Sequence, residues 1–125
     1  MAKLILMVGL PFSGKTTTAK RLEKEYEAIR LTPDEWHVKL FGQDVYDKEH
    51  DKRHSAIESI MVDLAFQLLK KGQNVILDFG FWATEERMNK RNNAPNNPYF
   101  YIPIEKYREY VKIFQKPTSA EGELI

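Results

Sequence analysis

Apolar residues occur in short continuous runs at several points along the chain. The runs Leu4 to Val8 and Val75 to Leu77 contain no polar residue, which is typical of strands covered on both faces. Ala28 to Leu31 forms a shorter strand candidate. Because helix-like segments separate these runs, we expect them to be strands of a parallel sheet.

Helical spacing marks the segments between the strands. Apolar residues recur at helical intervals from Lys15 to Tyr26, and again from about Glu49 to Lys71, where Gly72 ends the pattern. Thr32-Pro33-Asp34-Glu35 offers a capping threonine, a proline at the first helical position and a glutamate at the third. It predicts a short helix toward Leu40.

The second part of the chain has a weaker pattern. Thr84 to Arg87 opens a further helix with acidic residues in its first turn, and Ile104 to Phe114 is amphipathic. Tyr99 to Ile102 is left unassigned, because a short segment between two prolines is weak evidence for a strand. We expect the tail after Thr118 to be frayed.

This element order predicts a three-layer α/β fold, with a parallel sheet and helices on both faces. A length of 125 residues, 42% of them hydrophobic, suits one domain spanning residues 1–125. The 19 Lys+Arg residues are scattered among 18 Asp+Glu residues, so nothing indicates nucleic acid or an anionic membrane as a partner. The chain has no cysteine and no apolar run long enough to cross a bilayer, so we expect a cytoplasmic protein.

A phosphate-binding loop (Walker A motif) follows the first strand. Gly9-Leu10-Pro11-Phe12-Ser13-Gly14-Lys15-Thr16 fits G-x-x-x-x-G-K-[ST] between a buried strand and an amphipathic helix, which aims backbone N–H groups at a phosphate. Lys15 would reach the β- and γ-phosphates of ATP, Thr16 would bind Mg²⁺, and Thr17 could reach the α-phosphate. The expected cofactor-binding residues are Gly9, Pro11, Phe12, Ser13, Gly14, Lys15, Thr16 and Thr17.

Two aspartates at strand ends are the candidate acidic groups. Asp78 closes an apolar strand, where such a loop needs a carboxylate for Mg²⁺ or its water shell; the alternative is a turn-capping role. Asp34 follows the second strand at the edge where α/β sheets bind ligands, and could accept the proton of a hydroxyl that attacks the γ-phosphate. Its place in the first turn of a helix is an equally good structural explanation.

Two arginines could act on the phosphates. Arg87 and Arg91 could fold over them and neutralise charge in the transition state, although most arginines are simply solvated. Asn89-Lys90-Arg91-Asn92 is close to the guanine-reading N-K-x-D motif, but Asn92 stands where the aspartate is required. We therefore expect ATP and not GTP.

The histidines form no convincing metal motif. His50 and His54 are one helical turn apart, but H-E-x-x-H requires a glutamate where Asp51 stands. We interpret these two residues and His37 as surface residues or, at most, substrate contacts.

The sequence resembles the small P-loop kinases often labelled AAA-family ATPases, which are related to polynucleotide kinase, zeta toxin and chloramphenicol phosphotransferase. The resemblance covers residues 3 to about 87. Arg91-Asn92 and Phe114-Gln115-Lys116-Pro117 also resemble the family's lid and C-terminal segments. The segments that carry it are Leu4-Ile5-Leu6-Met7-Val8-Gly9-Leu10-Pro11, Ser13-Gly14-Lys15-Thr16-Thr17, Leu31-Thr32-Pro33-Asp34-Glu35-Trp36 and Asn74-Val75-Ile76-Leu77-Asp78-Phe79-Gly80-Phe81-Trp82.

The resemblance implies transfer of the γ-phosphoryl group from ATP to a hydroxyl of a small molecule or nucleotide. Asp34 stands at the position of the family's general base and Arg91 at that of a lid arginine. Two departures are that Phe12 replaces a loop glycine and that His37 stands where related kinases often carry an arginine.

A third departure is the short spacing between Arg87 and Arg91. Relatives usually place a helix, a fourth parallel strand and another helix between these points, so the resemblance implies a fold shortened in the lid and fourth-strand region. This shortening keeps one alternative open, an ATP-binding or ATPase module without transferase activity. A polynucleotide 5′-hydroxyl kinase ranks below it, because the basic residues near Asp34 are offset by acidic ones.

Overall fold

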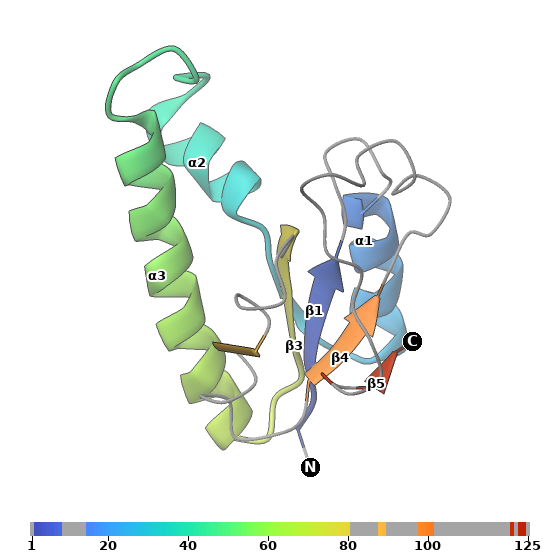
Figure 1. Ribbon diagram of the computed structural model, residues 1–125. Helices are drawn as coiled ribbons and strands as arrows, with labels where there is room; N and C mark the ends of the chain where they lie inside the picture. Colours follow the sequence, from blue (N-terminus) through green and yellow to red (C-terminus); the bar gives the residue numbers. More distant parts are fainter. Residues whose placement is uncertain are drawn as a thin grey trace.

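A five-stranded parallel sheet, in the order β2-β3-β1-β4-β5, lies at the centre of the molecule (Figure 1). The structure is a computed structural model that describes residues 2–8, 15–80, 88–89, 98–101, 121 and 123–124. Its strands are β1 (Leu4–Val8), β2 (Ile29–Leu31), β3 (Val75–Gly80), β4 (Pro98–Tyr101) and β5 (Glu123–Leu124). The predicted parallel sheet is thus confirmed.

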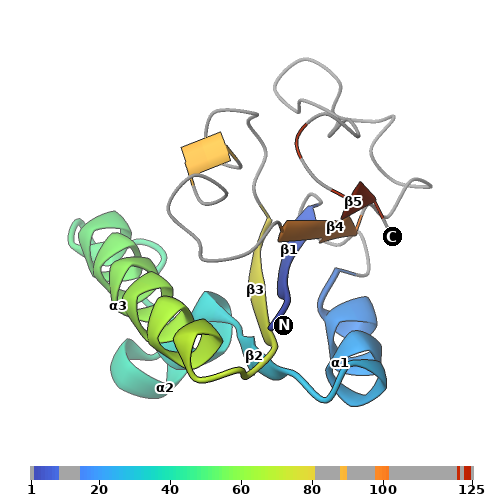
Figure 2. The same cartoon turned by 90° about the horizontal axis from the view of Figure 1, so that it is seen from below.

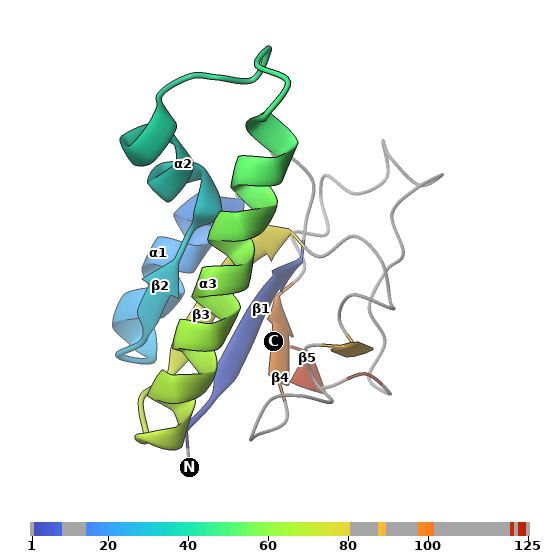
Figure 3. The same ribbon diagram turned by 90° about the vertical axis from the view of Figure 1, so that its left-hand side faces the viewer.

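Helices cover both faces of this sheet, as the sequence predicts. They are α1 (Lys15–Glu25), α2 (Pro33–Phe41) and α3 (His50–Lys70). α1 lies on one face, whereas α3 lies on the other (Figure 2). α2 packs beside α3 (Figure 3). The predicted three-layer α/β fold is therefore present.

The alternation of side chains along β1 divides the core into two halves. Leu4 and Leu6 belong to the cluster that includes α3, whereas Ile5 and Met7 belong to the cluster that includes α1. All of them are fully buried. This explains the continuous apolar run in the sequence, because a strand covered on both faces has no polar side.

The long helix α3 begins and ends close to its predicted bounds. Four of its residues at helical spacing face the sheet, namely Ile57, Met61, Ala65 and Leu69. Gly72 has a φ of +84°, a left-handed conformation that favours glycine, and its N–H donates to the carbonyl of Leu69. Gly72 therefore ends the helix as expected.

Two strands were missed by the sequence analysis. The unassigned segment from Tyr99 largely coincides with β4, which pairs with β1. Pro98 stands at the start of β4, the position in a strand that tolerates a proline. The tail is not entirely frayed, because β5 pairs with β4.

Other predictions fall outside the described residues. These are the helices expected near Thr84 to Arg87 and from Ile104 to Phe114. Among the residues that the structure does describe, no helix is both long and apolar enough to cross a membrane.

Candidate functional site

The residues of the predicted phosphate-binding loop lie between β1 and α1. β1 ends at Val8 and α1 begins at Lys15, so the predicted strand before the motif and the predicted helix after it are confirmed. Residues 9–14 themselves, which include Gly9, Pro11, Phe12, Ser13 and Gly14, lie outside the described part of the chain, as does the side chain of Lys15. The site is therefore built from the groups around the loop.

The two predicted metal-binding residues are brought together. The Thr16 hydroxyl, in the first turn of α1, donates to Asp78 Oδ2 across 2.9 Å. Asp78 is 2% exposed, although it carries a carboxylate. Burying such a group is costly unless hydrogen bonds or a cation compensate. Asp78 lies within β3 and not directly after it, because the strand continues to Gly80.

The two oxygens suit a small divalent cation. Mg²⁺ takes oxygen ligands at about 2.0–2.1 Å in an octahedron, so adjacent ligands lie about 2.9 Å apart. The separation of Thr16 Oγ1 and Asp78 Oδ2 is also 2.9 Å. The donor set and its spacing therefore fit Mg²⁺ without rearrangement of these side chains.

Thr32 is a member of this site that the sequence analysis interpreted as a helix cap. It stands at the N-cap of α2, but its hydroxyl makes no capping hydrogen bond. It donates instead to Asp78 Oδ2 across 3.0 Å. Glu35, which the capping pattern would turn toward Thr32, accepts from Arg30. The capping interpretation is therefore wrong for the side chains, although Pro33 does begin the helix.

Arg30, on β2, links α1 to the start of α2. Its Nε donates to Glu23 on α1 across 2.9 Å, and its Nη1 donates to the Thr32 hydroxyl across 2.5 Å. Burial lowers the pKa of Arg30, but its bonds to Glu23 and Glu35 outweigh this effect and raise it. Arg30 thereby fixes the hydroxyl that faces Asp78.

Loss of Arg30 should destabilise the domain. We expect Arg30→Ala to reduce the free energy of unfolding by about 1–2 kcal/mol, a value discounted because both glutamates are partly exposed. Urea denaturation measures the change. The matched control is Arg21→Ala, which removes an exposed pair with Glu25 on α1 and should cost less than about 0.5 kcal/mol. Equal losses in the two variants would contradict the role of Arg30.

Asp34 is located where a proton acceptor for a substrate could act. It lies in the first turn of α2, at the same edge of the sheet as Thr32, which bonds Asp78. Its side chain is 84% exposed, and its Oδ1 lies 3.8 Å from Nε2 of His54. The carboxylate is therefore open to an incoming molecule.

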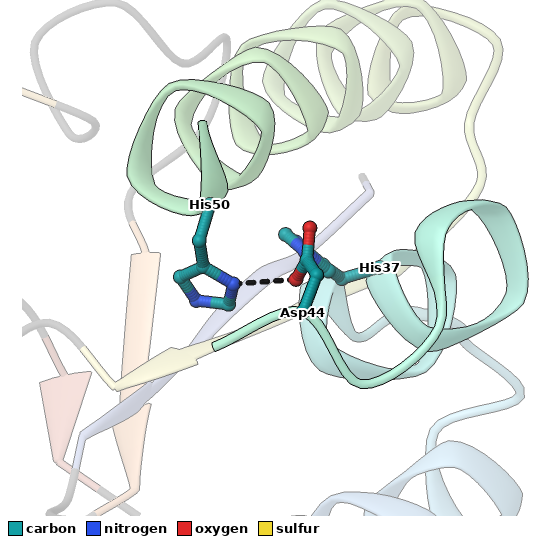
Figure 4. A group of neighbouring side chains, drawn as sticks. All are labelled: His37, Asp44 and His50. Atoms are coloured by element: carbon teal, nitrogen blue, oxygen red, sulfur yellow. Dashed lines mark hydrogen bonds and ion pairs between the residues drawn. The ribbon is translucent and has the colours of Figure 1, made fainter. Parts of the chain in front are cut away.

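The three histidines of the chain gather beside Asp34, where α2 meets the start of α3. The interpretation of the histidines as surface residues is wrong for His37, which is 3% exposed, whereas His50 and His54 are partly exposed. Asp44 Oδ1 lies 2.5 Å from His37 Nε2 and 2.6 Å from His50 Nδ1 (Figure 4). The spacing of two histidines on one helix was the signal available in the sequence, but the position of Asp44 in a loop gave none.

The His37, Asp44 and His50 group also offers ligand atoms within 4.8 Å of one another. Its contacts are those of a hydrogen-bonded cluster, because ligands of one metal ion bonded at about 2.0–2.1 Å lie farther apart than these N···O pairs. The second oxygen of Asp44 accepts from Arg53 across 2.9 Å. Protons therefore account for the geometry of this cluster.

The remaining predicted site residues are placed as follows. Thr17 is exposed on α1. Arg87 and Arg91, the two predicted phosphate-neutralising residues, lie outside the described residues.

A parallel sheet of order β2-β3-β1-β4-β5, with the loop motif between β1 and α1, defines a P-loop nucleotide-binding domain. The chain belongs to the AAA domain family, whose model matches residues 4–102. A search of curated proteins gave no match.

Solved structures show the same fold at low sequence identity. A proposed kinase from Chloroflexus aurantiacus is 20% identical, with a TM-score of 0.67, over 88% of this chain and 67% of that one. A chain of the Pnkp1/Rnl/Hen1 complex is 21% identical, with a TM-score of 0.59, over 94% of this chain and 42% of that one. A chain in a second structure, of the Pnkp1/Rnl/Hen1 RNA repair complex, is 20% identical, with a TM-score of 0.61, over 94% of this chain and 40% of that one.

The family and the fold place the chain among P-loop nucleotide-binding domains. The chain spans less than half of the two chains from the repair complex.

Proposed function

We propose that this chain is an ATP-dependent kinase that transfers the γ-phosphoryl group to a hydroxyl of a small molecule or nucleotide. In this proposal residues 1–125 act as one domain. Lys15 and the amides of the loop hold the phosphates, with Thr17 beside the α-phosphate. Thr16 and Asp78 hold Mg²⁺, which when bound withdraws charge from the phosphate oxygens.

The other predicted residues act on the attacking hydroxyl and the transferred group. Asp34 accepts the hydroxyl proton as the oxygen attacks phosphorus. Arg87 and Arg91 neutralise the charge that develops on the transferring phosphoryl group. Thr32 and Arg30 keep Asp78 oriented toward Thr16.

The observation that carries the proposal is the contact between Thr16 Oγ1 and Asp78 Oδ2. It joins the residue after the loop lysine to a buried carboxylate on the neighbouring strand. A solvated threonine and a turn-capping aspartate would have no reason to meet 62 residues apart in the sequence. A cation bound between them also offsets the cost of burying Asp78.

Calorimetric titration with MgATP and MgGTP tests the nucleotide site. We expect the wild type to bind MgATP, and Lys15→Ala to weaken binding by about 10–100-fold, because hydrogen bonds to charged groups contribute about 1.5–3 kcal/mol. Lys20→Ala, an exposed lysine on the same helix, is the matched control and should change the affinity by less than about twofold. Absence of binding by the wild type would disprove the proposal.

Transfer from γ-labelled ATP to a panel of acceptors separates the possible reactions. The panel contains nucleosides, small sugars and an oligonucleotide with a 5′-hydroxyl. A labelled small molecule supports the proposal, and a labelled oligonucleotide makes the chain a polynucleotide kinase instead. ATP hydrolysis at a rate that no acceptor changes would indicate an ATPase module without transferase activity.

A further inference from the structure

A series of polar contacts links the loop after α2 to the exposed carboxylate of Asp34. His37 Nε2 contacts Asp44 Oδ1, and His37 Nδ1 lies 3.3 Å from His54 Nδ1. His54 Nε2 in turn faces Asp34 Oδ1 across 3.8 Å. The two ring nitrogens of each histidine thus point to different partners, so the protonation of one ring restricts that of the next.

Asp44 determines which ring nitrogens of the neighbouring histidines carry protons. Desolvation raises the pKa of Asp44, but hydrogen bonds from His50, Arg53 and His37 outweigh it and hold the pKa well below its ordinary value. Asp44 is therefore a carboxylate that only accepts hydrogen bonds. It requires a proton on Nε2 of His37 and a proton on Nδ1 of His50.

The tautomer of His54 follows from that of His37. Neutral His37 with its proton on Nε2 has a bare Nδ1, which can only accept a hydrogen bond. The proton between the two rings must then be on Nδ1 of His54. Neutral His54 is left with a bare Nε2, and this is the atom that faces Asp34.

A bare imidazole nitrogen and a carboxylate oxygen repel each other unless a proton lies between them. The pair formed by His54 and Asp34 is therefore arranged to take up one proton. His54 is also held in orientation by its stacking on His50, with ring centroids 5.9 Å apart and planes 18° apart. By contrast, the carboxylate of Asp34 makes no ion pair shorter than this one with the side chain of any other described residue.

We propose that His54 accepts the proton that Asp34 takes from the substrate, and so returns Asp34 to its carboxylate form during phosphoryl transfer. The inference rests on the proposed kinase function and adds a positioning residue to it. The substrate O–H bond breaks and its proton passes to Asp34 while the oxygen bonds to the γ-phosphorus and the bond to ADP breaks. The proton then moves from Asp34 to His54 Nε2, and from His54 to water, which restores both groups.

The charges around His54 tune its affinity for this proton. Desolvation lowers the pKa of His54 below its ordinary value, as do the neighbouring His37 and His50, whereas Asp34 and Asp51 raise it. His54 is therefore mostly neutral at neutral pH, which is the state that can accept a proton. Below its pKa this capacity is lost, so the rate should fall as the pH falls through that value.

Nitrogen-15 NMR of the full chain tests the arrangement without any need for activity. We expect neutral His54 to carry its proton on Nδ1, against the usual preference of histidine for Nε2. His37→Phe should return His54 to the Nε2–H tautomer, since it removes the ring nitrogen that accepts from His54 Nδ1. If His37→Phe does not fold, Asp44→Ala serves the same purpose. His50→Asn is the matched control and should leave the tautomer of His54 unchanged.

The same spectra test the coupling to Asp34. Asp34→Asn should lower the pKa of His54, because it removes a negative charge that faces the ring. Asp51→Asn removes a charge that acts more weakly on His54 and should give a smaller shift. The proposal would be overturned by an Nε2–H tautomer of His54 in the wild type, or by a pKa of His54 that is the same in the wild type and in Asp34→Asn. Equimolar Zn²⁺ binding that shifts the signals of His37 and His50 together would also overturn it.

The kinetic test uses hydrolysis of MgATP, in which water takes the place of the acceptor. The wild-type kcat should rise with pH through the pKa of His54, and His54→Gln should lose this step and be roughly tenfold slower at neutral pH, with KM within about twofold. Glutamine can still hold Asp34 by a hydrogen bond but cannot take its proton. A His54→Gln enzyme with the wild-type profile would overturn the proposal, whereas a wild type that neither hydrolyses ATP nor labels any acceptor of the panel would count against the kinase function itself.

Discussion

Asp78→Asn is expected to lower kcat/KM for MgATP by about a thousandfold. A bound metal ion supplies several kcal/mol of transition-state stabilisation, and about 1.4 kcal/mol corresponds to a tenfold change in rate. Asparagine has the shape of aspartate and can still accept from the Thr16 and Thr32 hydroxyls, so the local hydrogen bonds should survive. Steady-state kinetics over a range of Mg²⁺ concentrations measures the loss, which excess Mg²⁺ should partly restore.

The control for Asp78→Asn is Asp63→Asn. Asp63 is an exposed aspartate on α3, far from the loop in the sequence, and its replacement should change kcat/KM by less than about twofold. Far-UV circular dichroism establishes that both variants are folded. A wild-type Mg²⁺ dependence in Asp78→Asn would remove Asp78 from the metal site and leave the Thr16 contact as a purely structural one.

Asp34→Asn is expected to lower kcat by about 10²–10³, because a positioned general base contributes factors of this size. KM for ATP should change by less than about twofold, since the carboxylate acts on the attacking oxygen and not on the nucleotide. The rate is measured with the acceptor identified from the panel, or with water where none is found. Because Asp34 is 84% exposed, the substitution should leave stability nearly unchanged.

Glu35→Gln is the matched control for Asp34→Asn. Glu35 stands in the same first turn of α2 and is also exposed, but its carboxylate accepts from Arg30. We expect kcat within about twofold of the wild type, with only a small loss of stability. If both variants were equally slow, the effect would come from the charge of the helix terminus and not from a base at Asp34.

Local sequence patterns were sufficient to predict the buried strand β1 and the long helix α3. The run from Leu4 to Val8 and the helical spacing in α3 reflect burial directly, so they could be recognised without long-range information. β4 and β5 differ, because each is short and owes its conformation to a neighbour. β4 pairs with the open edge of β1, and among the strands that the structure describes β5 pairs with β4 alone. A pairing partner distant in the sequence leaves no periodic signal in such short segments.

The candidate site divides in the same way. The loop motif and Asp78 could be proposed from the sequence because their chemistry is tied to positions directly after or within buried strands. Thr32 could not, since a threonine three residues before a glutamate satisfies the capping pattern equally well, and only Asp78, 46 residues away, decides between the two roles. The histidines could not be joined either, because Asp44 brings them together from a loop.

The strand order has a consequence for how the chain is synthesised. β1 leaves the ribosome before β3 and β4, its two partners in the sheet; even the hydrogen bond beside its start, from Lys3 to Asn74, spans 71 residues. The most apolar strand therefore waits unpaired while the helices α1, α2 and α3 are already being made. Chains that stop before Val75 have no native partner for this strand, and an unpaired apolar strand of this kind is prone to aggregation.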